Sequence, residues 1–279
     1  MSTSQKTILI TGAAGGIGRA CSHEFAARGY HIAAADRDAD GLKKLASELG
    51  TQVTPYTVDV RERAQLQSLA DQAWEAHGGI DIVLNNAGVV LFGPFAETSL
   101  DDWEWILEIN LWAPIRLSRM LAPRMIERKR GHIVVTASAA GLFPFPNLSS
   151  YTVSKFAMVG FCGAIRPELA QHGVDVTVVC PGPVGSNIAS GGRYAGDGSQ
   201  EAGHFGFAPS RGLTAEDAAR RMADGIERRE PMIVFPGVAR TLHAASRISP
   251  ALARQLGRGV FAGFDYLRKT RGKVSPLRN

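Results

Sequence analysis

The chain has 279 residues, of which 45% are hydrophobic and 20% are charged, a composition that suits one large α/β domain. Its net charge of +5 is unevenly spread: residues 237–279 carry a local +8, so residues 1–236 carry about −3 (5 − 8). A nucleic-acid enzyme should show basic residues around its site, and this mildly acidic body argues against that class.

The cysteines and the N-terminal residues indicate the compartment. Residues 1–6 lead directly into an apolar run and lack the apolar core of a signal peptide. Cys21, Cys162 and Cys180 are widely spaced and show no metal-ligand pattern. We therefore expect a cytoplasmic protein with reduced, packed thiols and no metal site.

Short apolar runs alternate with longer amphipathic stretches along the chain. Continuous β-branched runs such as Ile133–Val135 are typical of parallel strands that are buried on both faces. The predicted strands are 7–11, 31–36, 52–58, 80–85, 132–137, 175–180 and 232–235, and the predicted helices are 17–28, 40–49, 62–77, 101–130, 152–171 and 214–228. This alternation predicts an α/β fold with a single doubly wound parallel β-sheet of Rossmann type, flanked by helices. We assign residues 1–237 to this domain, with a substrate loop at about 186–212, and residues 238–279 to a basic helical extension.

A glycine-rich turn follows the first predicted strand. Gly12, Gly16 and Gly18 stand between the strand that ends at Thr11 and a predicted helix. Glycine permits the tight backbone path and lets a pyrophosphate approach the amides at the helix N-terminus. The context of a strand before the turn and a helix after it favours dinucleotide binding over an ordinary loop.

The second predicted strand ends at Asp36, where an acid can accept hydrogen bonds from both adenosine ribose hydroxyls. The alternative is that Asp36 only caps the next turn. A carboxylate there also repels a 2′-phosphate, so we predict NAD rather than NADP. Arg37 could tolerate that phosphate, but Ala14 supplies no second cation within the glycine turn.

Further motifs follow in a fixed order: Asp59-Val60, Asn85-Asn-Ala-Gly88, Asn110, Ser138, Tyr151-x-x-x-Lys155 and Pro181-Gly182. Together with Thr11-Gly-x-x-x-Gly-x-Gly18, they resemble the short-chain dehydrogenase/reductase family over about residues 6–237. The resemblance implies an NAD(P)-dependent oxidoreductase of the Tyr-x-x-x-Lys type.

The resemblance also implies which residues surround the cofactor. Asp59 and Val60 would contact the adenine, and Ser186, where the family often has Thr, could bond the nicotinamide amide. The remaining cofactor positions that it implies, besides those of the glycine turn, are Ile17, Asn86, Ala87, Gly88, Pro181, Gly182 and Val184.

Tyr151 and Lys155 lie one helical turn apart on the same helix face. Hydride transfer at an alcohol needs a base, and an ammonium beside the phenol lowers the high pKa that tyrosine normally has. Lys155 could also reach the nicotinamide ribose, and Ser138, just past a strand end, could hold the substrate oxygen. Asn110 resembles the family's fourth catalytic member, which holds a water that relays protons to Lys155. Each residue also has an ordinary structural interpretation, but together they reproduce the whole spacing.

Three loops should surround the substrate: Val89–Phe95, Gly141–Pro146 and Ser186–Gly212. The first two are rich in Leu, Phe and Pro and contain no cation, so we expect an apolar ketone or secondary alcohol. The third contains several glycines and reads as a mobile lid. The alternative for their aromatic residues is simple core packing.

Two other functions use a similar set of residues or the same fold. An epimerase or dehydratase uses similar Tyr/Lys chemistry, but a sizeable sugar-binding domain is missing from this sequence. A catalytically weak nicotinamide-binding sensor or scaffold should lack a catalytic residue, and all four are present.

The resemblance implies a homodimer or homotetramer formed through the predicted helices 101–130 and 152–171. Residues 249–273 of the extension form a basic amphipathic pattern in which Leu252, Leu256, Val260 and Phe264 recur at helical spacing. This segment could pack on the body or on a partner subunit, lie on an anionic membrane as a peripheral contact, or remain a disordered tail.

Overall fold

Seven parallel strands form the central sheet, and their order is β3-β2-β1-β4-β6-β7-β9. The computed structural model describes residues 5–185, 188, 191–196, 213–237 and 240. The strands are β1 (Thr7–Thr11), β2 (His31–Asp36), β3 (Val53–Thr57), β4 (Ile82–Asn85), β6 (Gly131–Thr136), β7 (Val174–Pro181) and β9 (Met232–Phe235). The predicted Rossmann-type α/β fold is confirmed, and two more short strands, β5 (Leu91–Phe92) and β8 (Arg193–Tyr194), pair outside the main sheet.

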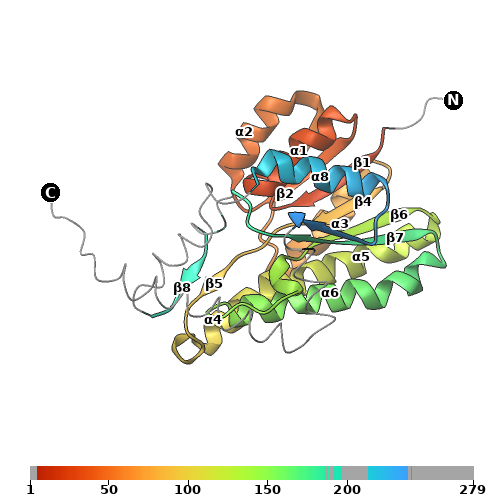
Figure 1. Cartoon of the computed structure of the whole chain (residues 1–279). Coiled ribbons are helices and arrows are strands. Elements are labelled where there is room, and N and C mark those ends of the chain that lie inside the picture. The colour runs from red at the N-terminus through yellow and green to blue at the C-terminus, as the bar shows by residue number, and fades with distance from the viewer. Residues whose placement is uncertain (1–4, 186–187, 189–190, 197–212, 238–239, 241–279) are drawn as a thin grey trace.

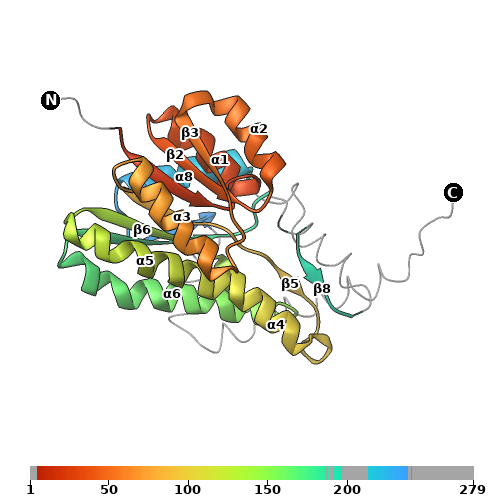
Figure 2. The same cartoon turned by 180° about the vertical axis from the view of Figure 1, so that it is seen from behind.

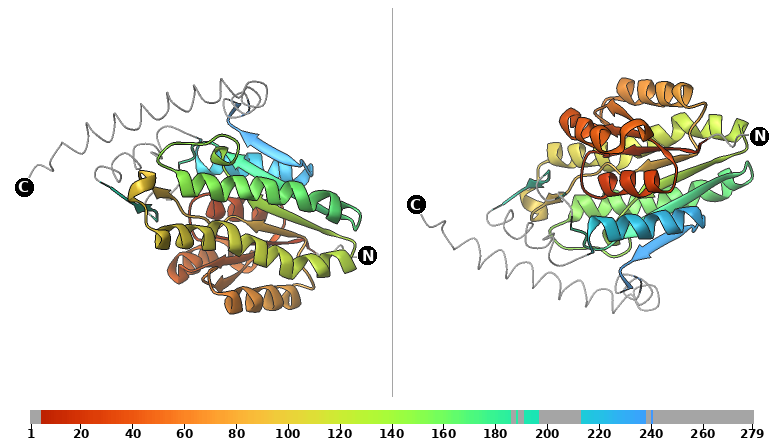
Figure 3. Two further views of the ribbon diagram at one scale, coloured as in Figure 1. Left: turned by 90° about the horizontal axis from the view of Figure 1, so that it is seen from below. Right: turned by 90° about the horizontal axis from the view of Figure 1, so that it is seen from above.

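Helices cover both faces of the sheet (Figures 1 and 3). One face carries α1 (Gly16–Ala27), α2 (Ala39–Leu49) and α8 (Ala215–Glu227), and the other carries α3 (Arg63–Ala76), α5 (Ala113–Glu127) and α6 (Ser149–Ala170). The structure also contains a shorter helix, α4 (Leu100–Leu107), and 3₁₀ turns at Gly50–Gln52, Phe95–Glu97 and Ala139–Gly141. Figure 2 shows α4, β5 and β8 together, at the end of the molecule away from the N-terminus.

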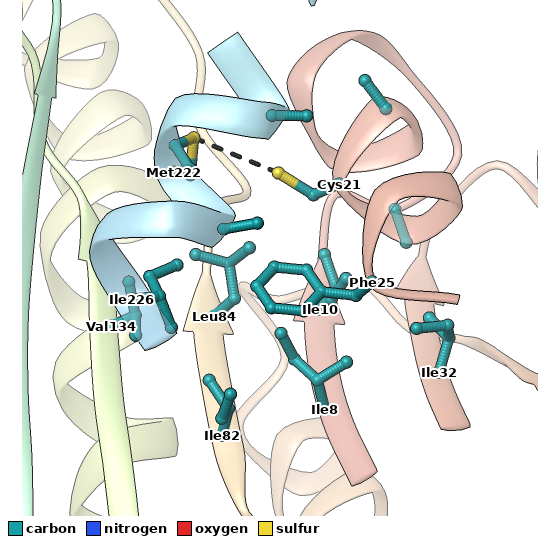
Figure 4. Packing of buried hydrophobic residues seen from close by; sticks show 14 of the residues in the cluster. Ile8, Ile10, Cys21, Phe25, Ile32, Ile82, Leu84, Val134, Met222 and Ile226 are labelled. Atoms are coloured by element: carbon teal, nitrogen blue, oxygen red, sulfur yellow. Dashed lines mark hydrogen bonds between the residues drawn. The ribbon is translucent and has the colours of Figure 1, made fainter. Parts of the chain in front are cut away.

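The strands are apolar throughout because both of their faces are buried. In β1, Ile8 and Ile10 face α1 and α8, whereas Leu9 between them joins the core beneath the opposite helices. Figure 4 shows Phe25 of α1 beside Ile10 of β1 and Ile226 of α8 beside Val134 of β6. Each such side chain, fully removed from water, contributes roughly 1.5–3 kcal/mol to folding. The three cysteines are free and buried, as predicted.

The predicted helix 101–130 is not continuous. A π-helical turn, Glu108–Trp112, separates α4 from α5. Asn110 lies in this turn and its side-chain amide bonds both backbone groups of Val89, with a donor–acceptor distance of 2.9 Å for each bond. The periodic pattern of the sequence does not reveal this contact between Asn110 and Val89. π-helical turns are frequent at functional sites.

The strand order reverses between β1 and β4, which makes that point the topological switch of the sheet. Loops at the carboxyl ends of β1 and β4 diverge there and leave a crevice, where open α/β sheets bind their ligands. No helix among the described residues is long and apolar enough to cross a bilayer.

Candidate active site

One cavity of about 400 Å³ lies at this switch point, within the range of small-molecule sites. Its lining comes from the carboxyl ends of six strands, β1, β2, β3, β4, β6 and β7, and the loops after them, and from α1, α6 and the π turn. Most of the predicted site residues line this cavity: Gly12, Gly16, Ile17, Asp36, Arg37, Asp59, Val60, Asn86, Ala87, Gly88, Ser138, Tyr151, Lys155, Pro181, Gly182 and Val184.

The glycine turn fits a pyrophosphate. Gly12 and Gly16 have φ of +69° and +50°, a region that glycine enters without strain. The N-cap of α1, Gly15, offers no side-chain cap, and the first turn of α1 contains no acid. The first amides of α1 are therefore left for a ligand, and the helix dipole favours an anion there.

Gly18 does not line the cavity, although the sequence assigned it to the cofactor. A Cβ at this position would lie 2.0 Å from the carbonyl oxygen of Gly12 and 2.7 Å from Nδ2 of Asn86. Its role is therefore indirect, since only glycine lets α1 pack closely against the turn that holds the phosphate.

Asp36 both faces the cavity and fastens the turn. One carboxylate oxygen accepts a hydrogen bond from the backbone N–H of Ala14, and the other accepts one from Asp38, each at 3.0 Å. Asp36 therefore closes the turn and also lines the cavity wall, and its hydrogen bonds to the adenosine ribose stay a prediction.

A second carboxylate at this end of the cavity is already paired. Arg61 holds Asp59 with its Nε at 3.1 and 3.0 Å and one terminal nitrogen at 2.6 Å. These hydrogen bonds lower the pKa of Asp59, and the nearby charge of Arg37 acts in the same direction. Asp59 therefore stays ionised, with Arg37 exposed beside it.

The opposite end of the cavity holds the polar groups expected for catalysis. Lys155 is 4% exposed, and its Nζ donates to the carbonyl oxygen of Thr136 at 3.0 Å. Burial lowers the pKa of Lys155 from 10.5 to about 8. A Cβ on Gly88 would lie 3.4 Å from the same Nζ, so the loop after β4 closely approaches this ammonium.

Tyr151 is buried, and it lines the cavity together with Ser138. Burial raises the pKa of Tyr151, whereas the side chain of Ser138 lowers it. The Nζ of Lys155 lies 5.6 Å from the centre of the Tyr151 ring. Tyr151 and Lys155 are therefore adjacent, as expected, with the ammonium over the face of the Tyr151 ring.

Asn110 is buried behind the cavity and does not line it. Besides bonding Val89, its Nδ2 donates to Oγ of Ser154 at 3.2 Å, and that hydroxyl donates to the carbonyl oxygen of Tyr151 at 2.7 Å. Asn110 thus connects the loop after β4 to the catalytic helix. The predicted water relay through Asn110 stays a prediction.

The predicted substrate loops contribute only in part. Val89, Phe145, Ile188 and Gly191 line the cavity, whereas Phe92 and Phe143 are buried in the core. Phe92 and Phe143 therefore pack in the core and do not face the substrate. Ser186 and most of the predicted lid, 197–212, lie outside the described residues.

Several lining residues were missed from the sequence: Gly15, Val58, Ile109, Thr136, Ala137, Ala139, Ala140, Leu148 and Pro183. Thr136 illustrates the available signal, because it is the last residue of β6 and the sheet's carboxyl edge carries the site. Ile109 and Leu148 come from elements whose approach to the cavity depends on tertiary packing.

The arrangement of a glycine turn, a ribose-side acid and a crevice at the switch point is that of a dinucleotide-binding protein. The family model for short chain dehydrogenase matches residues 6–193. The chain therefore belongs to the short-chain dehydrogenase/reductase family of oxidoreductases.

Individual relatives agree. Dehydrogenase/reductase SDR family member 7B of Xenopus tropicalis is 32% identical over 244 residues, covering 84% of this chain and 78% of that protein. The 1-deoxy-11-beta-hydroxypentalenate dehydrogenase of Streptomyces exfoliatus is 37% identical over 192 residues, covering 67% and 70%. Among solved structures, a short-chain dehydrogenase/reductase from Burkholderia phymatum in complex with NAD has a TM-score of 0.80 and 31% identity, covering 89% of this chain and 96% of that one.

Proposed function

We propose that this oxidoreductase transfers a hydride between NAD and an apolar secondary alcohol or ketone, with Tyr151 as the acid/base. The observation that carries the proposal is one continuous cavity with a phosphate-binding turn at one end and Ser138, Tyr151 and Lys155 at the other. The nicotinamide cofactor, when bound, supplies or accepts the hydride. Relatives support a nicotinamide cofactor, since solved neighbours hold NAD, NADPH or NADP⁺.

Different residues of the cavity would hold the different parts of the cofactor. The amides at the start of α1 would hold the pyrophosphate, and Asp36 would accept the ribose hydroxyls. Pro181 and Gly182 would flank the nicotinamide, with Val184 beside them, and Lys155 would reach the nicotinamide ribose.

The proton follows a short path. Ser138 would hold the substrate oxygen, and Tyr151 would donate its phenolic proton to that oxygen during reduction or remove it during oxidation. Lys155 would stabilise the resulting phenolate electrostatically once cofactor and substrate have closed the site. This proposal is supported by the place of both residues in the cavity wall and by the side chain of Ser138, which lowers the pKa of Tyr151.

We propose NAD as the preferred cofactor because the carboxylate of Asp36 lines the cavity and would repel a 2′-phosphate. Arg37 also lines the cavity and is the group that would allow NADP as a second choice. Arg61 is already paired with Asp59, so Arg37 is the arginine that would bind a 2′-phosphate.

The proposed substrate is apolar because the wall on the catalytic side consists mainly of Val89, Ala140, Phe145, Leu148 and Ile188. No Lys or Arg other than Lys155 lines that side among the described residues. Removing an apolar ketone from water into such a chamber stabilises the complex in proportion to the area buried.

We further propose a cytoplasmic homodimer or homotetramer. Trp112, Val153 and Phe156 expose 48%, 47% and 41% of their surface along the π turn and α6, which suits a contact with a second copy. Apart from Arg240, the basic extension, including residues 249–273, lies outside the described residues. Its peripheral membrane role would be supported by cosedimentation with anionic liposomes that is lost on truncation after Gly237, and contradicted by equal recovery in the supernatant with and without liposomes.

The test of the function is loss of reduced-nicotinamide absorbance with cyclohexanone, trans-decalone and a ketosteroid, run with NADH and NADPH side by side. The proposal expects turnover with the apolar ketones and a higher kcat/KM with NADH. Cofactor binding without turnover of any ketone would instead indicate a sensor or scaffold. A higher kcat/KM with NADPH would contradict the assignment of Asp36.

A further inference from the structure

Part of the cavity wall is held by an arginine on the substrate side. Arg193, in β8, places its guanidinium 4.2 Å from the centre of the Trp105 ring. The same guanidinium donates to Oδ1 of Asp102 at 2.8 Å. Trp105 and Asp102 both belong to α4, so one side chain of β8 is fixed to two residues of that helix. We refer to Arg193, Trp105 and Asp102 as the clamp.

Backbone contacts hold the same segment from its other side. The N–H of Arg193 donates to the carbonyl oxygen of Val90 at 3.0 Å, and the N–H of Ala195 donates to that of Phe92 at 2.9 Å. The approach is close, because a Cβ on Gly93 would lie 2.5 Å from the carbonyl oxygen of Ala195. Two backbone bonds form a short pairing that is marginal by itself, so the side-chain contacts of the clamp matter to its stability.

The clamp is continuous with the catalytic end of the cavity. Tyr151 packs in an apolar cluster against which Trp105 and Ile188 also pack. Ile188 and Gly191, which lie shortly before Arg193 in the chain, line the cavity. Releasing β8 from α4 would therefore let this part of the wall move away from Tyr151.

The cofactor side has a separate anchor. Val184 forms a bridge with Leu213, supported by a hydrogen bond from Gly185 N–H to the Leu213 carbonyl oxygen at 2.8 Å and one from Leu213 N–H to that of Pro183 at 3.2 Å. Loosening the clamp should consequently leave Pro181, Gly182 and Val184 in place beside the nicotinamide.

We propose that Arg193 is a positioning residue. It favours substrate binding because it holds Ile188 and Gly191 over the catalytic end of the cavity. This inference rests on the proposed function, since it assigns the wall of that same site. The clamp therefore affects the two ligands differently, because it controls the affinity for the ketone and leaves the affinity for the cofactor unchanged. Cation–π and ion-pair contacts of this kind suffice for about a tenfold effect.

The first measurement needs no substrate. Hydrogen exchange of the peptide containing residues 191–196 reports the amides of Arg193 and Ala195, both of which are bonded to β5. Arg193→Ala should speed their exchange, and Arg193→Lys, which keeps the charge but loses the planar stacking, should give an intermediate rate. Unchanged exchange in Arg193→Ala would overturn the clamp.

The second measurement is the steady-state KM for trans-decalone together with the Kd for NADH, measured by fluorescence. Arg193→Ala should raise this KM by about tenfold and leave the Kd for NADH within about twofold of the wild-type value. Trp105→Leu, which keeps apolar packing but removes the stacked ring, should act in the same direction. Faster exchange with an unchanged KM would overturn the positioning role.

Arg124→Ala is the matched control. Arg124 stacks on Trp74 at 5.7 Å and pairs with Asp71, but none of these residues lines the cavity. Its loss should change neither the exchange of residues 191–196 nor the KM. If the wild-type protein reduces no ketone, the proposed function fails, whereas the exchange comparison still decides whether the clamp holds the wall.

Discussion

Lys155 brings a positive charge into the interior, where its Nζ donates to the carbonyl oxygen of Thr136. Because burial lowers its pKa from 10.5 to about 8, the folded state disfavours the protonated form. The destabilisation is fully present below the folded pKa and disappears as pH rises toward the unfolded pKa, and its size is about 3 kcal/mol.

Lys155→Met should therefore stabilise the cofactor-free protein at pH 7, by up to about 3 kcal/mol, while abolishing turnover. The gain over the wild-type protein should shrink as pH rises from about 8 to 10.5. Urea unfolding at a series of pH values measures both effects. A variant that is less stable than the wild-type protein at pH 7 would show that the ammonium contributes to folding and is not a strained group retained for catalysis.

Gly18 offers a second test at the residue scale. In Gly18→Ala the new methyl carbon would lie 2.0 Å from the Gly12 carbonyl oxygen, so either α1 or the turn must shift. We expect lower thermal stability and at least about tenfold weaker NADH binding. Gly15→Ala is the control for stability, because no protein atom lies within 4 Å of its new methyl carbon. Equal thermal stability of the two variants would refute the packing role of Gly18.

At the scale of the elements, the strands were the most predictable feature. β1 and β2 match their predicted ranges, because buried parallel strands are apolar along their whole length. The glycine turn and Asp36 were predictable for a related reason, since both stand where a predicted strand ends.

The break between α4 and α5 was not predictable from periodicity, because Trp103, Ile106 and Ile109 continue an apolar pattern across it. The contact of Asn110 with Val89 that accompanies the break is tertiary. The clamp could not be predicted from the sequence for the same reason, since Arg193 and Trp105 meet only after α4 and β8 have packed together.

His132 makes β6 sensitive to acid. It is 5% exposed, bonds Oγ1 of Thr177 at 2.8 Å, and has its pKa lowered from 6.5 to about 4 by burial, with a smaller contribution from Arg229. The folded state thus excludes a proton that the unfolded chain accepts. Stability should be complete above pH 6.5 and fall by about 1.4 kcal/mol per pH unit as pH decreases toward the folded pKa.

His132→Gln keeps a hydrogen-bonding side chain but cannot be protonated. We expect its stability to decline less steeply than that of the wild-type protein between pH 6.5 and about 4. Carboxylates titrate in both proteins, so the difference between the two curves isolates this histidine. Parallel curves across that range would contradict the assignment.

At the scale of the whole molecule, Trp112, Val153 and Phe156 are large apolar residues with 41–48% of their surface exposed. We expect light scattering to give at least twice the mass of one 29.8 kDa chain. Phe156→Glu should shift the mass toward one chain, because a charge would be buried without a partner. A wild-type mass equal to a single chain would contradict this proposal.

The central claim is that one cavity joins cofactor binding to proton transfer by Tyr151. Its most direct test is Tyr151→Phe, in which the ring packing is kept and only the hydroxyl is removed. Reduction of trans-decalone by NADH should fall by about 10²–10⁴-fold, while the Kd for NADH stays close to the wild-type value. Turnover by Tyr151→Phe within about tenfold of the wild-type rate would contradict the mechanism.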